Sequence, residues 1–397
     1  MIYFHFNQGD DMSTLISFLG KQMNGYRETE YELNNQFFTT KFMGADLTQI
    51  IKPKKLLLIG TAGSMWDVLF DHYGTTDERL LELIEKSSQN EVDENFLQAF
   101  TPELEQKLGC EVRCIVIGYA RDSVEQIAIL QRISRELCEN ECISLDVTHG
   151  FRHLPMLALV AARFLKSIKN IRTEHIYYGA FEMRNENNRT PVVDLSGMLT
   201  MLDWVDALSA YKQSDNYAAF IPLLDSHNGQ LLKEAAFFEN INQMQFSRSS
   251  LKEFNKNLQS NQINNLFLPL VKNDWVQRLQ WVKEKGHYER QLYLAKRHLE
   301  NGNYLQASIL SNEAWISKKI KFNNQYQNVH GLRDKAKDEL KKTLNSTGKK
   351  LFNEISAIRN AMAHGTKPDN ADILPILNNQ EKLHQKLKDI IQYIETW

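Results

Sequence analysis

This chain of 397 residues has no net positive charge and no long apolar run, and we expect no secretion signal. The formal net charge is -2, so no overall field draws nucleic acid to the protein, and any such contact must come from a local patch. The longest apolar run, residues 154–162, is far shorter than the about 20 residues that cross a bilayer. Residues 1–6 lack a basic segment and a small-residue cleavage site, so we expect a cytoplasmic protein without a membrane span. We expect residues 1–11 to be an extension outside the main fold.

Cysteine is also scarce, with two Cys-x3-Cys spacings formed by Cys110, Cys114, Cys138 and Cys142. Such spacings would suit a zinc site. Cys110 and Cys114 alternate with polar residues, however, so on a strand both thiols would lie on one buried face. We therefore favour reduced cysteines of the core and expect no metal.

Short apolar runs alternate with helical patterns in the first half of the chain. Strands are predicted at residues 14–20, 54–59, 112–117, 142–147 and 173–178, and helices at 66–72, 123–137 and 156–166. Residues 26–42 predict a β-hairpin around an Asn-Asn turn. This alternation predicts an α/β, Rossmann-like parallel sheet, in which the loops at the carboxyl ends of the strands line a ligand crevice.

The second half predicts a different architecture. A last strand-like segment is expected at 192–202, followed by a helix at 204–211, and beyond Asp215 no strand pattern is found. We therefore expect an all-α C-terminal domain with a helical hairpin around residues 301–303. The expected division is a ligand-sensing domain of residues 1–203, a helical linker region of 204–285 and a C-terminal helical domain of 286–397.

Two loops at strand ends have the residue types of a ligand site. Residues 60–64, Gly-Thr-Ala-Gly-Ser, are small enough for backbone N–H groups to approach a phosphate or ribose. Residues 148–155 bring a hydroxyl, two imidazoles, a glycine and a guanidinium together at the next strand end but one. The alternative for this second loop is a polar turn that caps the following helix, with Thr148 as the cap and Pro155 in the first turn.

One Arg and His pair has a spacing suited to phosphodiester chemistry. Arg359 and His364 lie at the end of an amphipathic pattern, residues 351–363, which Gly365 terminates. Residues five apart on a helix are rotated by about 140° and separated by a rise of about 7.5 Å. One copy therefore cannot easily bring both side chains to one phosphate, whereas a symmetric dimer would form a composite site. Chance also produces such a spacing, so a solvated arginine and a capping histidine remain the alternative.

A cluster of lysines precedes this pair. It consists of Lys335, Lys337, Lys341, Lys342, Lys349 and Lys350. Such clusters are commonly solvated faces of helices. The alternative is a local positive patch that guides a polynucleotide to the site.

Together these stretches resemble the CRISPR-associated ribonucleases of type III systems, which join a CARF sensor domain to a C-terminal HEPN domain. Residues 15–20, the hairpin and residues 57–61 resemble the sensor, and Leu-Asp-Val-Thr-His-Gly-Phe-Arg-His-Leu-Pro at 145–155 is the most specific match. The Arg-Asn-Ala-Met-Ala-His run at 359–364 resembles the HEPN motif Arg-x4-6-His, and residues 304–314 resemble an earlier helix of that domain.

The resemblance implies a homodimeric, metal-independent endoribonuclease that cuts single-stranded RNA when its sensor binds a cyclic oligoadenylate, with cyclic tetra-adenylate expected before cyclic hexa-adenylate. By matching position, the implied ligand contacts are Gly20, Thr61, Ala62, Gly63, Ser64, Thr148, His149, Gly150, Phe151 and Arg152. The implied catalytic residues are Arg359, Asn360 and His364. No cofactor is expected. His364 would transfer protons, Arg359 would stabilise the phosphorane, and Asn360 would orient the phosphate.

Two other functions stay open at this point. A ligand-sensing regulatory module would use its helical domain to recruit a partner without catalysis. A DNA-binding regulator is a weaker alternative, because no helix-turn-helix with a basic recognition helix is recognisable, and we expect no stable DNA partner. A further hypothesis is slow cleavage of the bound ring by the loop 148–152, which has a hydroxyl, an imidazole and a guanidinium together.

Overall fold

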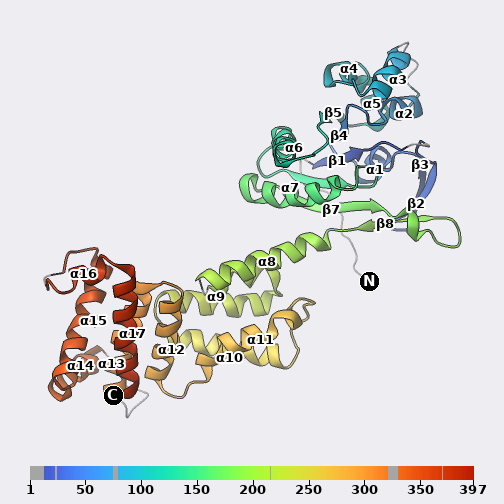
Figure 1. Ribbon diagram of the computed structural model, residues 1–397. Coiled ribbons are helices and arrows are strands. Elements are labelled where there is room, and N and C mark those ends of the chain that lie inside the picture. The colour runs from blue at the N-terminus through green and yellow to red at the C-terminus, as the bar shows by residue number, and fades with distance from the viewer. Residues whose placement is uncertain (1–12, 23–24, 75–78, 215, 321–329, 369) are drawn as a thin grey trace. The chain divides into compact units, whose positions relative to one another are not determined.

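The computed structural model describes residues 13–22, 25–74, 79–214, 216–320, 330–368 and 370–397. The chain divides into two compact units between Leu202 and Asp203. The first unit is α/β and the second is helical throughout its described residues (Figure 1), which confirms the predicted fold class. The extension expected at residues 1–11 lies outside the described residues. Among the described helices, none is long and apolar enough to span a membrane.

The first unit is built on one eight-stranded sheet with the order β3-β2-β8-β7-β6-β1-β4-β5. The strands are β1 (Ser13–Leu19), β2 (Thr29–Leu33), β3 (Gln36–Thr40), β4 (Lys55–Thr61), β5 (Glu111–Ile117), β6 (Cys142–Asp146), β7 (Arg172–Gly179) and β8 (Thr190–Asp194). The strands from β7 to β5 are parallel, whereas β8 is antiparallel to β7 and β3 is antiparallel to β2. The predicted hairpin is confirmed as β2 and β3, with Asn34 and Asn35 at φ of 52° and 63°.

Helices cover both faces of the sheet (Figure 1). One face packs against α1 (Met43–Ile51), α2 (Trp66–His72), α3 (Arg79–Gln89), α4 (Glu94–Gln98) and α5 (Thr101–Leu108), and the other against α6 (Ser123–Arg135) and α7 (Leu154–Lys169). Strand β1 is buried on both faces: Leu15 and Leu19 enter one core, and Ile16 and Phe18 enter the other. Such a strand does not show a regular alternation of apolar and polar residues, and its buried Ser17 has a hydrogen-bond partner in Asp146.

Two finer predictions concerned the burial of Cys110 and Cys114 and the position of the last strand. Cys110 and Cys114 pack with Val112 against the core on the α1 side, as predicted, and burial raises the pKa of the Cys110 thiol to about 11. The strand expected at 192–202 was placed wrongly, because β8 ends at Asp194 and α8 (Gly197–Ser214) already begins at Gly197. The Asp194 carboxylate accepts the backbone N–H of Ser196 at 2.8 Å and turns the chain out of the sheet.

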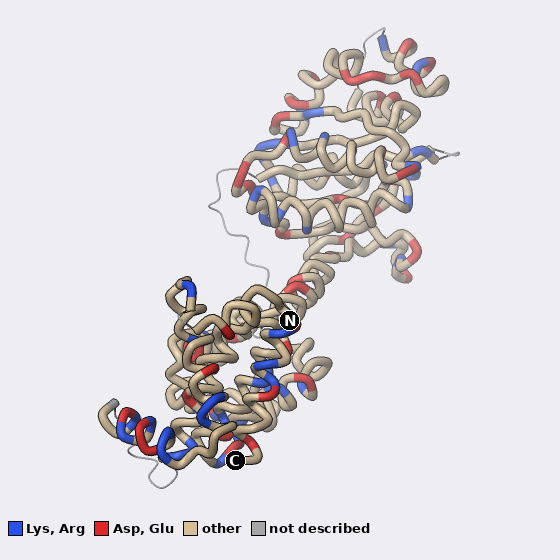
Figure 2. The backbone as a smooth tube through the Cα atoms, turned by 60° about the vertical axis from the view of Figure 1, so that its left-hand side comes forward, with Lys and Arg blue, Asp and Glu red and all other residues tan. Residues whose placement is uncertain are grey.

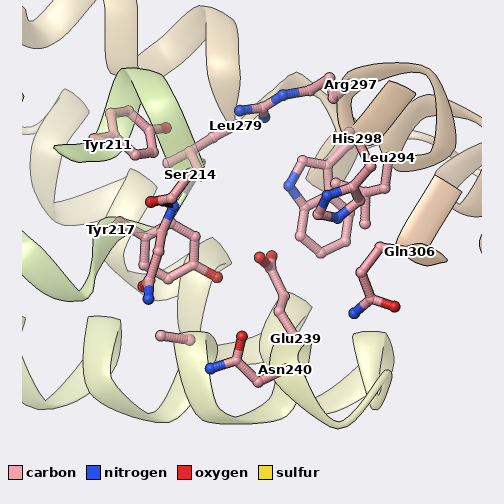
Figure 3. Close-up of a pocket in the computed structure, with 13 residues that line it drawn as sticks. Tyr211, Ser214, Tyr217, Glu239, Asn240, Leu279, Leu294, Arg297, His298 and Gln306 are labelled. Carbon is pink, nitrogen blue, oxygen red and sulfur yellow. Dashed lines mark hydrogen bonds between the residues drawn. The ribbon is translucent and has the colours of Figure 1, made fainter. Parts of the chain in front are cut away.

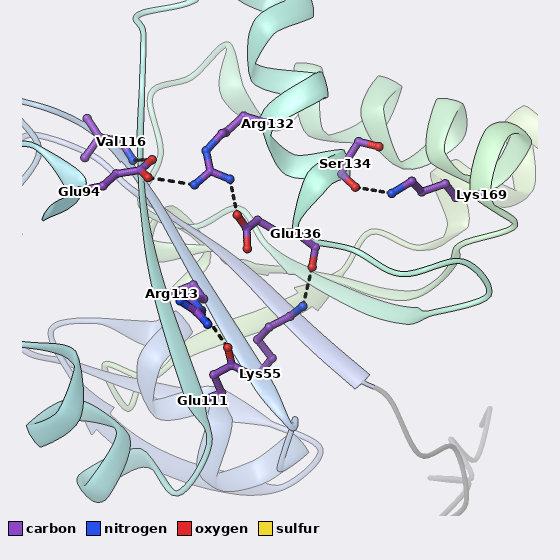
Figure 4. Close-up of polar contacts among 9 residues, drawn as sticks. All are labelled: Lys55, Glu94, Glu111, Arg113, Val116, Arg132, Ser134, Glu136 and Lys169. Atoms are coloured by element: carbon purple, nitrogen blue, oxygen red, sulfur yellow. Dashed lines mark hydrogen bonds and ion pairs between the residues drawn. The ribbon is translucent and has the colours of Figure 1, made fainter. Parts of the chain in front are cut away.

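Carboxylates protect the outer edge of strand β5 (Figure 4). The backbone N–H of Val116 donates to Glu94 Oε1 at 3.0 Å, and that of Val112 donates to Glu105 Oε1 at the same distance. Arg132 joins Glu94, at 2.9 Å, to Glu136. An edge strand whose outward N–H groups are already paired is a poor template for a further strand.

The second unit has a single hydrophobic core that runs from Trp204 to Ile394. Its helices after α8 are η2 (Tyr217–Leu223), α9 (Ser226–Asn240), α10 (Met244–Gln259), α11 (Leu268–Arg278), η3 (Gln280–Lys283), α12 (His287–Glu300), α13 (Tyr304–Ile320), α14 (His330–Thr343), α15 (Ser346–His364), α16 (Leu374–Leu377) and α17 (Gln380–Thr396). Helices α12 and α13 form the predicted hairpin around residues 301–303. Because residues 204–285 and 286–397 share this core, the boundary between them remains a proposal about function.

Candidate functional site

The sheet has a topological switch point at strand β1. After β1 the chain forms the hairpin β2 and β3 at the far edge of the sheet, then adds β4 and β5 on the other side of β1, and finally returns to β6 and β7. In open sheets of this kind, ligands bind at the carboxyl ends of the strands where the strand order reverses. The loop after β1, of which residues 20–22 and 25–28 are described, and the loop after β6, residues 147–153, therefore border the place where a ligand is expected.

A pocket of about 370 Å³ lies at this crevice. It is lined by Gln22, Gly25, Tyr26, Arg27, Thr29, Tyr31, Thr148, His149, Tyr178, Gly179, Phe181 and Glu182. Its volume falls in the range of small-molecule sites. Of the ligand contacts expected from the sequence, Thr148 and His149 line it, and the tyrosines and Arg27 were missed. These residues could have been found from the sequence by their position: they follow β1 or lie near the predicted hairpin, close to the expected ligand crevice.

The His149 imidazole is a neutral group in this pocket. Burial lowers its pKa, and the nearby Asp146 only partly opposes that effect. Its Nε2 accepts the backbone N–H of Met43 at 3.3 Å, and its ring lies 4.5 Å from the ring of Tyr26. Because Nε2 is the acceptor, the proton is on Nδ1. The ring therefore offers a ligand a hydrogen-bond donor and an aromatic face.

A buried carboxylate fixes the loop that carries this histidine. Asp146 is fully buried and accepts hydrogen bonds from the Ser17 hydroxyl at 2.7 Å and from the backbone N–H of Thr148 at 3.0 Å. The Thr148 hydroxyl accepts the backbone N–H of Gly179 at 2.9 Å. Together with burial, the Asp146 charge raises the pKa of Tyr31 to about 12. Sequence reasoning counted Asp146 as the end of a strand and missed its part in holding the site.

Two glycines let the loops approach one another. A Cβ atom at Gly20 would lie 2.0 Å from the carbonyl oxygen of His149, and one at Gly150 would lie 2.8 Å from Cβ of Phe18. The backbone N–H of Gly20 donates to Tyr26 Oη at 2.8 Å. Both positions thus need glycine for close packing of the backbone, whether or not a ligand is bound.

The small-residue loop after β4 is tied down by its own side chains. Ser64 Oγ accepts the backbone N–H of Thr61 at 2.8 Å and donates to the Leu19 carbonyl at 2.9 Å. Thr61 and Ser64 are both buried, as is Gly63, and Ala62 is half-buried. The hydroxyls therefore shape this loop and join it to β1.

The remaining part of the 148–155 loop turns toward strand β5. Arg152 is exposed, and the Phe151 ring lies 6.1 Å from the ring of Tyr119, which follows β5. His153 Nε2 lies 2.9 Å from the Tyr119 carbonyl oxygen, and the Tyr119 hydroxyl donates to Asn90 Oδ1 at 3.2 Å. Neither Tyr119 nor Asn90 was among the expected ligand residues.

In the second unit, the Arg359 and His364 pair lies on one uninterrupted helix. Helix α15 begins five residues earlier than the sequence pattern indicated, because Asn345 caps it by accepting the Gly348 N–H at 2.8 Å. It ends as predicted at Gly365, whose φ is 63°. His364 and Asn360 are exposed, and Arg359 is half-buried. The helical spacing that separates Arg359 from His364 within one copy is therefore present.

The opposite side of α15 packs on α13. Ile355 and Ile358 are fully buried, and the buried Asn312 of α13 donates from Nδ2 to Ser356 Oγ at 3.0 Å. This hydrogen bond fixes the rotation of α15, so that the buried stripe faces the core and Asn360 and His364 face solvent.

A second pocket lies inside the helical unit (Figure 3). Glu239, Tyr217 and His298 are among its lining residues, and its cavity of about 60 Å³ has room for a few water molecules. Burial and the neighbouring Glu239 raise the pKa of Tyr217. A nucleotide does not fit there, so the pocket of the first unit is the better candidate for a nucleotide ligand.

Comparison with known proteins bears on the first unit. Residues 14–182 match the model of the family described as CRISPR system endoribonuclease Csx1, CARF domain. The chain contains a CARF domain. This domain extends from β1 into η1 (Phe181–Met183) and includes the switch point, the pocket and the 148–155 loop. The resemblance of residues 15–155 to a CARF sensor is thus confirmed.

A curated relative extends the likeness beyond the CARF domain. The CRISPR-associated protein MJ1674 of Methanocaldococcus jannaschii is 22% identical over 92% of this chain. The chain spans 63% of the length of that relative. The match includes the helical unit, whereas the family match ends within η1.

Proposed function

We propose that this protein is a cyclic oligoadenylate-activated, metal-independent endoribonuclease that cuts single-stranded RNA in type III CRISPR antiviral defence. One observation carries the proposal: a helical unit that follows a CARF domain presents Arg359, Asn360 and His364 at the solvent-facing end of one helix. The CRISPR names of the matched family and of the relative support the biological setting.

The CARF pocket is the proposed activator site. CARF domains bind cyclic oligoadenylates as a class, and we propose cyclic tetra-adenylate here, with the hexa-adenylate as second choice. The neutral His149 would donate from Nδ1 to a base or ribose, and the exposed Arg152 would pair with a phosphate. Backbone groups of residues 61–64 would approach the ring from β4.

The proposed cleavage needs only groups of the RNA and the protein. The ribose 2′-oxygen attacks the neighbouring phosphorus and loses its proton, and the 5′-oxygen leaves and gains one. His364 would transfer one of these protons, and Arg359 would stabilise the charge on the phosphorane. Asn360 would orient the scissile phosphate. The products would have a 2′,3′-cyclic phosphate and a 5′-hydroxyl.

A homodimer would supply Arg359 and His364 from two facing helices. The outer face of α7 supports such a dimer, because an apolar stripe runs along it at intervals of four residues. Met156, Val160, Phe164 and Ile168 are 72%, 63%, 49% and 52% exposed. Since α7 begins directly after the ligand loop, a second copy covering this stripe would bring the two loops to one axis.

The lysines of residues 334–350 would guide RNA to the helical unit. This segment contains six lysines and three acidic residues, and Figure 2 shows basic and acidic positions interleaved on α14. The surplus of positive charge is therefore modest. We propose a weak, salt-sensitive contribution to RNA binding from this segment.

The test is cleavage of a labelled single-stranded RNA in EDTA, with and without cyclic tetra-adenylate. We expect the ring to switch on cleavage and both Arg359→Ala and His364→Ala to reduce it by at least a hundredfold, about 3 kcal/mol of transition-state stabilisation. Asn353→Ala, on the exposed face of the same helix, is the control and should retain activity. Tight ring binding without any cleavage would support the regulatory module instead.

The CARF loop 148–152 would also cleave the bound ring slowly and so limit the signal. Its Thr148 hydroxyl, His149 imidazole and Arg152 guanidinium lie within five residues of the chain, and Thr148 and His149 line the pocket. Chromatography of the ligand after long incubation tests this hypothesis, and an unchanged ring would refute it.

A further inference from the structure

Three loops meet at the β5 end of the CARF domain, outside the pocket described above. Asn90 follows α3, Tyr119 follows β5, and Phe151 lies in the loop after β6. The Tyr119 and Phe151 ring centroids are 6.1 Å apart, and the Phe151 and His153 rings are stacked at 6.0 Å. The Tyr119 ring is 38% exposed. Aromatic faces accessible at the carboxyl edge of a parallel sheet are suited to stacking on a nucleobase.

The amide of Asn90 is held in one orientation at this place. The Tyr119 hydroxyl donates to Asn90 Oδ1 at 3.2 Å. Asn90 also packs on the loop after β4, since a Cβ atom at Gly63 would lie 1.9 Å from the same Oδ1. Asn90 and Ala120 both have a left-handed backbone, at φ of 59° and 57°, which fixes the two turns.

This orientation presents the hydrogen-bonding pattern that reads adenine. A carbonyl oxygen has two lone pairs, so Oδ1 of Asn90 accepts from Tyr119 with one and has a second for the adenine N6 amino group. The Nδ2 group beside it donates to adenine N7. Asn contacts adenine in this bidentate way, and guanine or hypoxanthine places an acceptor oxygen opposite Oδ1.

A two-fold symmetric complex with a cyclic tetranucleotide would need a second base site in each protomer. A cyclic tetranucleotide on a two-fold axis gives each protomer two nucleotides, and the pocket of about 370 Å³ is the size of one of them. Residues 148 and 149 of the ligand loop line that pocket, whereas Phe151 and His153 of the same loop contact Tyr119. The loop therefore separates two places at which a base can be held.

We propose that Asn90, Tyr119 and Phe151 form a second adenine-binding subsite of the CARF domain, and that Asn90 selects the base. The proposal rests on cyclic oligoadenylate being the activator. Asn90 reads the base edge, one of the two rings stacks on the base face while the other, tilted by 59° from the first, contacts the base edge-on, and the Tyr119 hydroxyl is a positioning group that keeps the Asn90 amide from rotating.

The experiment compares binding of cyclic tetra-adenylate and cyclic tetra-inosinate to the full chain by titration calorimetry. Asn90→Gly tolerates the left-handed backbone. It removes the Oδ1 acceptor, which distinguishes the N6 amino group of adenine from the 6-oxygen of hypoxanthine, and the N–H donor to N7, which both bases share. We expect the wild type to prefer the adenylate ring by about ten- to a hundredfold and Asn90→Gly to lose most of that preference. Loss of the N7 contact weakens both rings alike, so the ratio of the two affinities is the readout.

Two further variants make the result specific. Asn140→Gly is the matched control: Asn140 also has a left-handed backbone, at φ of 62°, and its Oδ1 accepts from Asn170 at 2.7 Å, but it precedes the amino end of β6, away from the carboxyl ends of the strands. It should leave the ratio unchanged. Tyr119→Phe keeps the ring but releases the Asn90 amide, so it should lower the ratio while affinity for the inosinate ring stays close to wild type.

The outcomes separate this proposal from the proposed function. An unchanged ratio in Asn90→Gly, with tight wild-type binding, overturns the subsite and leaves the activator in place. Absence of binding of either cyclic tetra-adenylate or cyclic hexa-adenylate to the wild type overturns the proposed function and the subsite together.

Discussion

Replacing Gly20 with alanine would press a methyl group into the backbone of the ligand loop. The new Cβ would lie 2.0 Å from the His149 carbonyl oxygen. Carbon atoms in contact are normally about 3.5 Å from their neighbours, so the two loops would have to separate by about 1.5 Å. Gly20 N–H donates to Tyr26 Oη at 2.8 Å, and Tyr26 Oη donates to the His149 carbonyl at 3.3 Å. Separation of the loops breaks this bridge.

The expected loss of unfolding free energy can be estimated from the hydrogen bonds that the substitution breaks. Besides these two, the Met65 N–H donates to the Gly20 carbonyl at 3.1 Å. Three hydrogen bonds at about 0.5 to 1.5 kcal/mol each indicate a loss of roughly 1.5 to 4.5 kcal/mol of unfolding free energy. Hydrogen exchange of peptides from β1 and β6 at increasing urea measures this loss in the first unit alone. Binding of cyclic tetra-adenylate should weaken in the same variant.

Gly197→Ala is the matched control. Gly197 is not in the left-handed region, and among the described residues no heavy atom lies within 4 Å of its added Cβ. Its change in stability should stay within about 0.5 kcal/mol. If Gly20→Ala were as stable as Gly197→Ala, with unchanged exchange at β6, the close approach of the two loops would be refuted.

The structure also predicts the effect of lowering the pH on the helical unit and of a charge introduced on the outer face of α7. Burial, with Arg290 and Arg333 nearby, lowers the pKa of His287 to about 4, so between pH 6.5 and 4 the unfolded chain binds a proton that the folded chain does not. The helical unit should therefore lose roughly 3 kcal/mol of stability as the pH falls through that window, and a His287→Asn variant with the same pH slope in urea unfolding would contradict this. Val160→Glu on the α7 stripe should dissociate the dimer in sedimentation, whereas Leu81→Glu, 75% exposed on α3, should not; a dimer that survives Val160→Glu would exclude this face.

Local features of the fold were predictable because short-range physics sets them. Asn34 and Asn35 tolerate the left-handed backbone of a tight hairpin, and Gly365 ends α15 for the same reason. The end of β8 was only partly a local matter. Asp194 accepts the Ser196 N–H two residues on, but its carboxylate is also held by His175, at 2.7 Å, and by the Ile176 N–H of the neighbouring strand, which a short sequence window does not show.

The candidate site divides in the same way. The cluster at 148–152 is visible in the sequence because a hydroxyl, imidazole, glycine and guanidinium are adjacent in the chain. Its supports are not visible: Asp146 is held by Ser17, 129 residues away, and Asn90 meets Tyr119 from another loop. Side-chain chemistry at one strand end is local, whereas the partners of that strand end depend on strand order.

The sequence by itself determined the alternation of strands and helices, the all-helical second half, the CARF likeness and the helix that carries Arg359 and His364. Periodicity, turn residues and a contiguous motif are properties of neighbouring residues, so they can be recognised from the sequence alone. Only the tertiary structure decided that β1 lies between β6 and β4, that Thr61 and Ser64 are buried in their own loop, and that three separate loops meet at Tyr119. Those features depend on which distant segments pack together, and packing is a property of the whole chain.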